Sequence, residues 1–170
     1  MARIESTEKL LEKIVPRQVS VTETTDKEGE VQKVETLTQG VAVVDHGRSG
    51  VDLEVLASAE QVVDIAVAMA EHGFFLESVT GVDWIKEDQM EVIYDYNRMD
   101  KDQCRVMVRA RIPRDTPKIP TICEIHPGGN WHERETHDFF GIKFQGHPDL
   151  SPLLLPEDAD FHPLLKDFKP

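Results

Sequence analysis

Two neighbouring segments with alternating side chains place the tightest limit on how this chain folds. Residues 89–97 and 103–112 carry apolar side chains at every second position, and five residues separate them. A period of two is typical of a β-strand with one buried face, and the short connection predicts that the two strands pair. The predicted core positions are Met90, Val92, Tyr94, Tyr96, Cys104, Val106, Val108 and Ala110.

The other face of this strand pair is charged. It carries Glu91 and Asp95 on the first strand, and Arg105 and Arg109 on the second. Opposite charges on neighbouring strands favour ion pairs across the sheet. We interpret these residues as stabilising a sheet face that is solvated or covered by a partner, and we assign them no chemistry.

Residues 58–73 give the clearest helical pattern in the chain. Its apolar face consists of Val62, Ile65, Ala66 and Met69. Ser58 and Gln61 form a capping-box pattern at the start, and Gly73 is typical of a C-terminal stop. One apolar face predicts that this helix packs on the sheet.

The first forty residues predict a helix followed by a hairpin. A short helix is expected over residues 4–15, with Ser6 or Thr7 as its N-cap and Pro16 as its end. Residues 17–38 then read as two polar strands that turn at the sequence DKEGE.

The chain changes character after Pro113, where prolines become frequent and periodic patterns end. We predict an α+β fold in which helices pack on a mainly antiparallel or mixed sheet. Residues 1–141 form a single domain, with residues 1–40 as a peripheral helix and hairpin. Residues 142–170 form an extended tail, rich in proline and leucine, which needs a partner surface to cover its leucines.

Charge and composition narrow the possible roles. With 19 Lys+Arg against 32 Asp+Glu, the net charge of -13 disfavours binding to nucleic acid or directly to a membrane surface. No apolar run approaches the roughly twenty residues that span a bilayer, and the acidic start does not resemble a signal peptide, so we expect a cytosolic chain.

The two cysteines, Cys104 and Cys123, are too few for an iron–sulfur cluster or a four-cysteine zinc site, and we expect buried thiols.

The stretch GNWHERETHDFFG, residues 129–141, mixes charges with large aromatic residues. As one helix capped by Asn130, it would place four residues on a single stripe through their three- and four-residue spacing. These four residues are Trp131, Arg134, Glu135 and Asp138. The stripe is either a solvated face with an Arg134–Asp138 pair or a surface that a partner covers.

Histidines concentrate near the C-terminus, which raises the alternative of a metal site. Five of the seven lie in the last 45 residues, namely His126, His132, His137, His147 and His162. His132, Glu133 and His137 read H-E-x-x-x-H, whereas a zinc-binding helix needs H-E-x-x-H. The extra residue turns the two imidazoles about 140° apart, so a regular helix cannot hold one metal between them. A stand-alone metal-dependent hydrolase is therefore the least favoured hypothesis.

The charged stretch also resembles the signature of a known family. It reads Glu133-Arg134-Glu135, two residues, Asp138, Phe139-Phe140, six residues, and then His147-Pro148-Asp149-Leu150. This is similar to the signature of the respiratory complex I 30 kDa subunit family, known in bacteria as the C subunit of NADH-quinone oxidoreductase. The motifs HPGGNW, LLLPED and HPLLKDF also resemble family motifs, so the match extends over about 45 residues.

The resemblance implies a hydrophilic, cofactor-free assembly subunit of a proton-translocating NADH-quinone oxidoreductase, which performs no chemistry by itself. The implied partners are the large hydrogenase-like subunit that forms the quinone site and a neighbouring iron–sulfur subunit, with FMN and iron–sulfur clusters held by partners. The chain would lie on the cytoplasmic side of the inner membrane and reach the membrane only through the complex. No catalytic, cofactor-binding or metal residue is expected.

The partner interface that the resemblance implies consists of Trp131, Glu133, Arg134, Glu135, Asp138, His147, Pro148, Asp149, Lys166 and Asp167. Charges beside a tryptophan become favourable where a second protein supplies matching donors. Replacing Glu135 or Asp138 with alanine should then weaken assembly and leave the isolated fold largely intact.

Departures from the family pattern keep a second function open. Ser151 and Pro152 stand where the family usually has two basic residues, and Leu165 replaces an arginine. These changes put contacts with acidic groups of the partner in doubt. The alternative is the equivalent subunit of a membrane-bound energy-converting nickel–iron hydrogenase, or of a related ferredoxin-linked complex.

Overall fold

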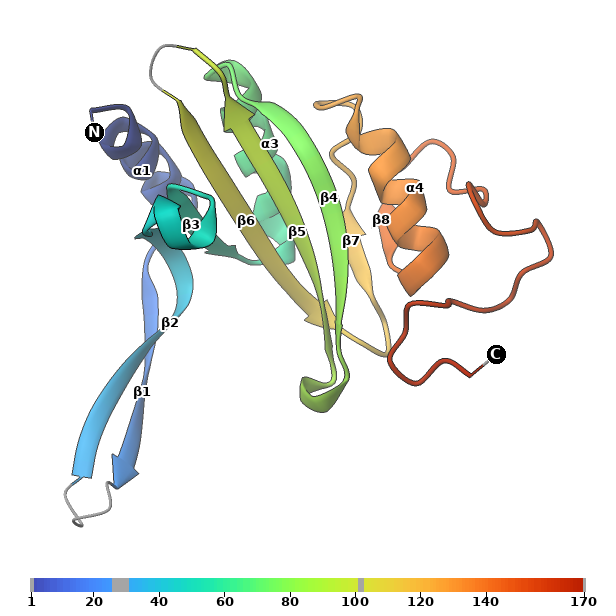
Figure 1. Ribbon diagram of the computed structural model, residues 1–170, viewed down its shortest axis with the longest axis horizontal. Helices are drawn as coiled ribbons and strands as arrows, with labels where there is room; N and C mark the ends of the chain where they lie inside the picture. The colour runs from blue at the N-terminus through green and yellow to red at the C-terminus, as the bar shows by residue number, and fades with distance from the viewer. Residues whose placement is uncertain (1, 26–30, 101–102, 170) are drawn as a thin grey trace.

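The structure, a computed structural model, describes residues 2–25, 31–100 and 103–169. Its strands are β1 (Gln18–Thr25), β2 (Val31–Val43), β3 (Leu53–Ala57), β4 (Phe75–Trp84), β5 (Gln89–Arg98), β6 (Cys104–Pro113), β7 (Lys118–Pro120) and β8 (Lys143–Gln145). Its α-helices are α1 (Ala2–Ile14), α2 (His46–Ser49), α3 (Val62–Glu71) and α4 (Gly129–Phe140), with 3₁₀ turns at Ala59–Gln61 and Ile85–Glu87. The predicted α+β class is confirmed, because helices pack on a mixed sheet (Figure 1).

The main sheet has six strands in the order β1-β2-β3-β6-β5-β4. Neighbours run antiparallel except β3 and β6, which are parallel. β4 therefore runs in the same direction as β3, and α3 carries the chain between them across β6 and β5. A crossover between strands of equal direction needs such a long connection, which explains why a helix covers this face of the sheet. β7 and β8 form a separate parallel pair.

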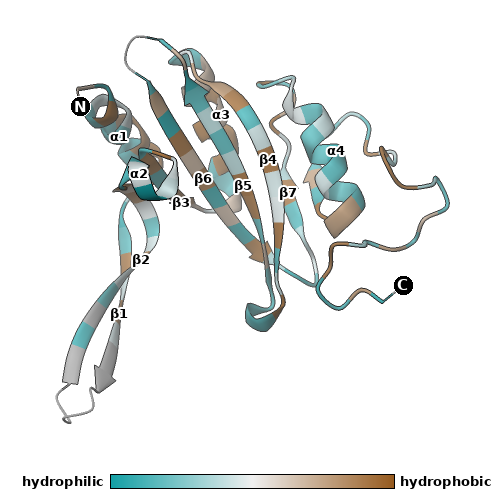
Figure 2. Ribbon diagram, in the orientation of Figure 1, coloured by the Kyte–Doolittle hydropathy of each residue, from teal (hydrophilic) through white to brown (hydrophobic). Residues whose placement is uncertain are grey.

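The predicted central strand pair is confirmed. Tyr94 on β5 lies opposite Val108 on β6, and both side chains are buried in the core. Figure 2 shows the alternation as teal and brown bands along these two strands. On the other face, Arg109 Nε lies 3.0 Å from Glu91 Oε1, so the expected cross-strand ion pairing is present. The predicted helical face is confirmed too, because α3 buries Val62, Ile65, Ala66 and Met69.

The first hairpin projects from the body as a two-stranded ribbon (Figure 1). β2 pairs with β1 along its first part and with β3 only over residues 40–43. Gly40 lies at the change of partner with φ 134°, and a Cβ there would come within 3.2 Å of Arg17 Cα. Glycine is needed at this bend because other residues avoid positive φ. The hairpin is confirmed, while its predicted turn at residues 26–30 lies outside the described residues.

Helix α4 packs against the edge strand β4 through a glycine. A Cβ on Gly81 would lie 2.7 Å from Phe140 Cδ2 and 2.9 Å from Thr136 Cγ2, so the helix approaches to a distance that only glycine allows. Glycine in a strand interior often marks such a close approach. This contact fixes where α4, which carries the family-like signature, lies relative to the sheet.

The N-terminal helix begins earlier than its sequence predicted. α1 starts at Ala2, so Ser6 and Thr7 lie inside the helix and the predicted N-cap is wrong. The Ser6 hydroxyl donates to the carbonyl of Arg3 in the preceding turn, which satisfies it without a capping role.

The start of α4 also differs from its prediction. The helix begins at Gly129 with Gly128 as its N-cap, so the assignment of Asn130 as the cap is wrong. The Asn130 amide donates to the carbonyl of Pro127, which places Asn130 within the first turn. A turn over residues 126–129 therefore starts the helix before the capping pattern that we identified.

Two short strands occur where an irregular connection and tail were predicted. Lys118–Pro120 pairs in parallel with Lys143–Gln145, and each strand has three residues, too few for an alternating pattern to be read. Ile142 and Phe144 are buried in the core, just beyond the expected core end at Gly141. The division into a domain and a partner-binding tail stays a prediction.

The Gly81 contact gives a test of this packing. Gly81→Ala should lower the free energy of unfolding by about 1–3 kcal/mol, because the new methyl group overlaps Phe140 and Thr136. Gly128→Ala is the matched control, since a Cβ there meets no atom within 4 Å. Urea unfolding of both variants measures the difference, and equal stabilities would contradict the close packing of α4 on β4.

Candidate functional site

Helix α4 divides the predicted interface residues between its two sides. Glu133 and Asp138 are buried at 0% and 4% exposure, whereas Trp131 is 60% exposed and Glu135 is also exposed. Arg134 is half-buried, and its guanidinium lies 5.4 Å from the centre of the Trp131 ring. The predicted single stripe is therefore not a single surface, because Asp138 points into the protein and Trp131 points out.

Glu133 joins α4 to the loop that follows β7. Its carboxylate accepts a hydrogen bond of 2.8 Å from the Ile122 backbone amide and another from the Thr121 hydroxyl. Burial raises the pKa of Glu133 from 4.5 to about 7, although both hydrogen bonds act in the opposite direction. Glu133 thus has partners within the chain and holds its proton unusually strongly for a carboxyl group.

A small cluster around Glu133 brings together three side chains that can bind metals. Ligand atoms of Cys123, Glu133 and His147 lie within 4.8 Å of one another, and the His147 Nε2 atom is buried with no hydrogen-bond partner. His147 Nδ1, however, accepts a hydrogen bond of 3.1 Å from the Asp149 amide. A neutral imidazole that accepts a hydrogen bond at Nδ1 carries its proton on Nε2. A histidine that binds a metal through one ring nitrogen almost always donates a hydrogen bond through the other, whereas Nδ1 of His147 accepts one.

The hydrogen bond at Nδ1 of His147 therefore does not match the arrangement that is usual for a metal-binding histidine. His147 Nε2 lies 3.9 Å from Glu133 Oε2, and burial lowers the pKa of His147, which favours the neutral ring. Of the five C-terminal histidines, only His147 takes part in this cluster, which is the one such group among the described residues. The geometry does not favour the metal-dependent hydrolase.

Asp138 fixes the middle of the tail. Its Oδ2 atom accepts hydrogen bonds from three successive amides, at 2.8 Å from Leu153 and Leu154 and 3.3 Å from Leu155. Burial raises the pKa of Asp138, but the three N–H donors outweigh it and hold the pKa below 3.8. The hydrogen bonds to ionised Asp138 thus stabilise the folded state above about pH 3.8. This stabilisation is lost as the pH falls through the lower pKa that Asp138 has in the folded state.

A second carboxylate fixes the end of the tail. Asp83 at the end of β4 is 4% exposed and accepts from Arg114 Nε at 2.8 Å and from the Lys166 amide at 2.8 Å. Arg114 also donates to Asp167 Oδ1 at 2.6 Å. Lys166 and Asp167, predicted at the partner interface, thus have bonds within the chain.

Sequence reasoning missed Asp83 and Arg114 because their partners are far along the chain. The only local signal is that Asp83 continues the inward-facing alternation of β4 after Val79 and Gly81. A carboxylate at a core-facing position needs buried donors, and this requirement could have indicated an anchor.

The tail segment that follows Pro148 and Asp149 of the predicted interface also contacts α4. Arg134 donates to the Ser151 carbonyl at 3.2 Å and the Pro152 carbonyl at 3.4 Å. Pro148 and Asp149 are exposed in the turn before this contact. The residues that depart from the family pattern therefore contact the signature arginine, Pro152 through its carbonyl, and Ser151 through its carbonyl and also its hydroxyl, which accepts from Arg134 Nη2 at 3.3 Å.

The bound tail leaves several large apolar side chains in solvent. Leu154 is 60% exposed, Leu164 is 49% exposed and Phe161 is 41% exposed. The Leu154 amide is bonded to Asp138, and the Leu164 amide donates to the carbonyl of Phe139 at 3.1 Å. Trp131 and these tail leucines are thus held on or directly against α4.

Comparisons with known proteins assign the chain to a family. Residues 55–170 match the family described as "Respiratory-chain NADH dehydrogenase, 30 Kd subunit". The chain belongs to this family. The resemblance of its C-terminal signature to the 30 kDa subunits is thereby confirmed, and the matched region includes both α4 and the tail.

Three relatives show the range of complexes in which such subunits occur. The chain is 39% identical to the NADH-quinone oxidoreductase C subunit of Roseiflexus castenholzii, over 68% of this chain and 69% of that protein. It is 41% identical to the F(420)H(2) dehydrogenase C subunit of Methanosarcina mazei, over 54% of this chain and 58% of that protein.

The third relative is a solved structure, "Structure of the membrane-bound sulfane sulfur reductase (MBS), an archaeal respiratory membrane complex". One of its chains matches with a TM-score of 0.71 and 26% identity, over 99% of this chain and 86% of that chain. None of the described helices of this 30 kDa-type subunit combines the length and apolar character that crossing a membrane requires.

The raised pKa of Glu133 gives a test by pH. Glu133 is protonated up to about pH 7 in the folded state and up to about pH 4.5 in the unfolded state. The free energy of unfolding therefore falls as the pH rises between these values, because the unfolded chain releases this proton first. Relative to Glu133→Gln, the parent should lose about 3 kcal/mol of unfolding free energy between pH 4.5 and pH 8. Denaturant unfolding at both pH values measures this loss, and parallel pH profiles would contradict it.

The bonds of Asp138 revise the expectation that Asp138→Ala leaves the isolated fold intact. The variant leaves three tail amides without their acceptor and should lose about 1–3 kcal/mol of unfolding free energy. The tail should also be cleaved faster by a protease. Glu135→Ala on the exposed side of α4 is the control. Equal tail cleavage in both variants would show that Asp138 does not hold the tail.

Proposed function

We propose that this chain is an assembly subunit of a membrane-associated oxidoreductase of complex I type, and that it docks on the large quinone-site subunit through α4 and the tail. Family membership makes it one of several subunits in a complex of NADH-quinone oxidoreductase type. The observation that carries the docking surface is the set of exposed apolar side chains held around α4. Trp131 and Leu154 are each 60% exposed, although the backbone beside Leu154 is anchored by a buried carboxylate.

The backbone that carries the exposed leucines is held against α4. An exposed leucine in a mobile tail needs no explanation, but Leu154 lies in a segment whose amides are bonded to Asp138. Exposed apolar groups in fixed positions mark surfaces that another protein covers. Because the backbone of Leu154 and Leu164 is bonded to α4 before binding, association costs less conformational entropy than it would for a mobile tail. Trp131 with Arg134 beside it matches the residue types that dominate binding energy in such surfaces.

The chain itself carries out no bond-making step in this proposal. The buried carboxyl groups whose pKa values are shifted, Glu133, Asp138 and Asp83, accept hydrogen bonds from the chain's own backbone, and two of the three are also bonded to its own side chains. Groups that are engaged in this way fix the fold and are not placed to meet a substrate. Flavin and iron–sulfur clusters would belong to partner subunits, including a neighbouring iron–sulfur subunit, and the chain would reach the cytoplasmic side of the membrane through them.

A second candidate is the equivalent subunit of an energy-converting nickel–iron hydrogenase or a related ferredoxin-linked complex. Two observations favour it. The chain matches a subunit of an archaeal respiratory membrane complex over 99% of its length, and it lacks basic residues at Ser151, Pro152 and Leu165. The two candidates differ in the large subunit, because a nickel–iron site needs four cysteines that a quinone-site subunit lacks.

Affinity purification of the tagged chain from its native membranes tests the proposal. We expect the large subunit to co-purify with the parent, and we expect Glu135→Lys to reduce its recovery about tenfold, because a reversed charge in a covered surface costs more than about 1.4 kcal/mol. Glu71→Lys, the same change on the exposed side of α3, is the matched control.

The identity of the recovered proteins decides between the candidates. A large subunit without paired nickel-binding cysteines supports the complex I-type assignment, and one with these cysteines supports the hydrogenase-type complex. Recovery of no large subunit, or equal recovery with both lysine variants, would contradict docking through α4. An iron–sulfur or flavin absorbance in the isolated chain would contradict the cofactor-free role.

A further inference from the structure

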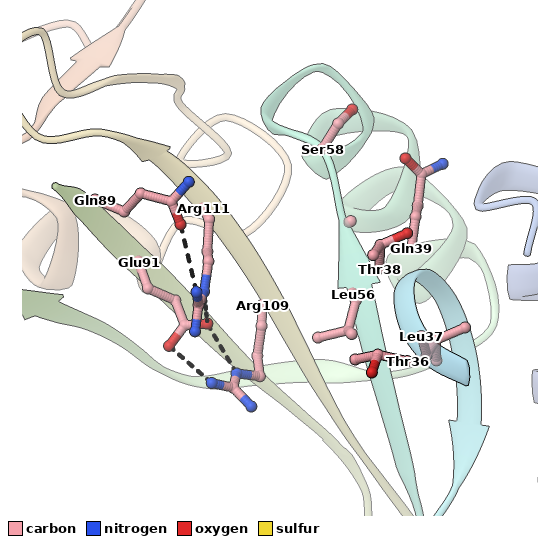
Figure 3. Close-up of a pocket in the computed structure, with 11 residues that line it drawn as sticks. Thr36, Leu37, Thr38, Gln39, Leu56, Ser58, Gln89, Glu91, Arg109 and Arg111 are labelled. Carbon is pink, nitrogen blue, oxygen red and sulfur yellow. Dashed lines mark hydrogen bonds and ion pairs between the residues drawn. The ribbon is translucent and has the colours of Figure 1, made fainter. Parts of the chain in front are cut away.

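A groove of about 590 Å³ lies where the ribbon leaves the sheet, far along the chain from α4 and the tail. One wall is formed by four successive residues of β2, Thr36 to Gln39, and the floor includes Arg109 and Arg111 of β6. Figure 3 shows the floor residues on one side, the β2 residues on the other, and Leu56 between them. The groove opens on the sheet face that α3 does not cover.

The charged side chains on the floor of the groove are already paired with one another. Arg109 binds Glu91 through Nε and Nη2, both at 3.0 Å, and binds Glu54 through Nη1 at 2.7 Å. Glu91 is 1% exposed and also accepts from Trp84 Nε1 at 3.1 Å. A set of charges that are already paired with one another offers little to an anionic small molecule. Recognition in this groove therefore has to come from its other wall.

That wall presents a strand edge. β2 is paired with β1 over residues 31–39, but β3 reaches β2 only at residues 40–43. In the part of the chain that the structure describes, no strand pairs with β2 on the groove side of residues 31–39. Every second residue of an antiparallel strand directs its N–H and C=O away from its partner, so along Thr36 to Gln39 this edge offers donors and acceptors that no described strand pairs with.

The ribbon also has apolar surface that its own chain leaves uncovered. Val19 and Val21 on β1 are 42% and 56% exposed, and Val19 lies opposite Leu37 of the groove wall. Leu37 and Leu56 are half-buried at the groove. An isolated two-stranded ribbon is only marginally stable in water, and a third strand would stabilise it.

We propose that an extended segment of another subunit binds in this groove as an added β-strand, paired with the open edge of β2. This partner is distinct from the α4 surface, although the inference rests on the proposed role as a subunit of a larger complex. Main-chain bonds to β2 would supply affinity, and apolar side chains at alternate positions would contact Leu37 and Leu56. A second copy of this chain is a poor occupant, because two chains of charge -13 repel one another.

Hydrogen exchange at single-residue resolution tests the proposal on the isolated chain and on the purified membrane complex. In the isolated chain, the β2 amides that face β1 should be protected and the alternate amides that face the groove should exchange freely. In the complex, the groove-facing amides should exchange at least about tenfold more slowly. The amides on the outer edge of β1 are the internal control and should not change.

A photo-reactive residue identifies the occupant. Placed at Thr38 in the groove wall, it should cross-link within the complex to one continuous stretch of another subunit, whereas the same residue at Ser20 on β1 should not. Unchanged exchange on β2, protection without a two-residue period, or a cross-link to a second copy of this chain would each overturn the proposal. Failure of the chain to co-purify with any subunit would appear before these measurements and would contradict the proposed function itself.

Discussion

Buried carboxylates that must find hydrogen-bond donors determine the structure of the C-terminal third of this chain. A buried carboxylate without donors is strongly unfavourable, so each one orders the segment that supplies its N–H groups. Glu133 orders the loop at Ile122, Asp138 orders the tail at Leu153, and Asp83 orders its end at Lys166. A leucine-rich segment with no helix or strand period thereby acquires one conformation on the surface of α4.

This arrangement separates two roles that the family signature combines. The inward members of the charged helix, Glu133 and Asp138, hold the chain together, and the outward members, Trp131 and Glu135, are free to contact a partner. Arg134 belongs to both sets, because it bonds the tail at Ser151 and stacks beside Trp131. A docking surface built in this way depends on the fold of the tail, so loss of an inner carboxylate is expected to affect binding indirectly.

Local patterns in the sequence were sufficient for the longer elements but not for the short strands β7 and β8, for the starts of α1 and α4, or for the contacts between elements. Alternation identified β5 and β6, and helical spacing identified the buried face of α3, because both signals depend only on neighbours along the chain. The signature pointed to Glu133 and Asp138, but apart from the Thr121 hydroxyl their donors are backbone amides, which carry no mark in a sequence. The Asp83–Lys166 bond joins positions 83 residues apart, and the bend at Gly40 is set by the approach of Arg17.

Docking through α4 requires that its outer side and the ordered tail are covered in the assembled complex. Hydroxyl-radical footprinting of Trp131, in the isolated chain and in the complex purified from native membranes, tests this requirement most directly. Met99, which directly follows β5 and is 71% exposed, serves as the reference. We expect Trp131 to be oxidised readily in the isolated chain and to be protected in the complex. Equal oxidation of Trp131 in both states would contradict docking through this surface.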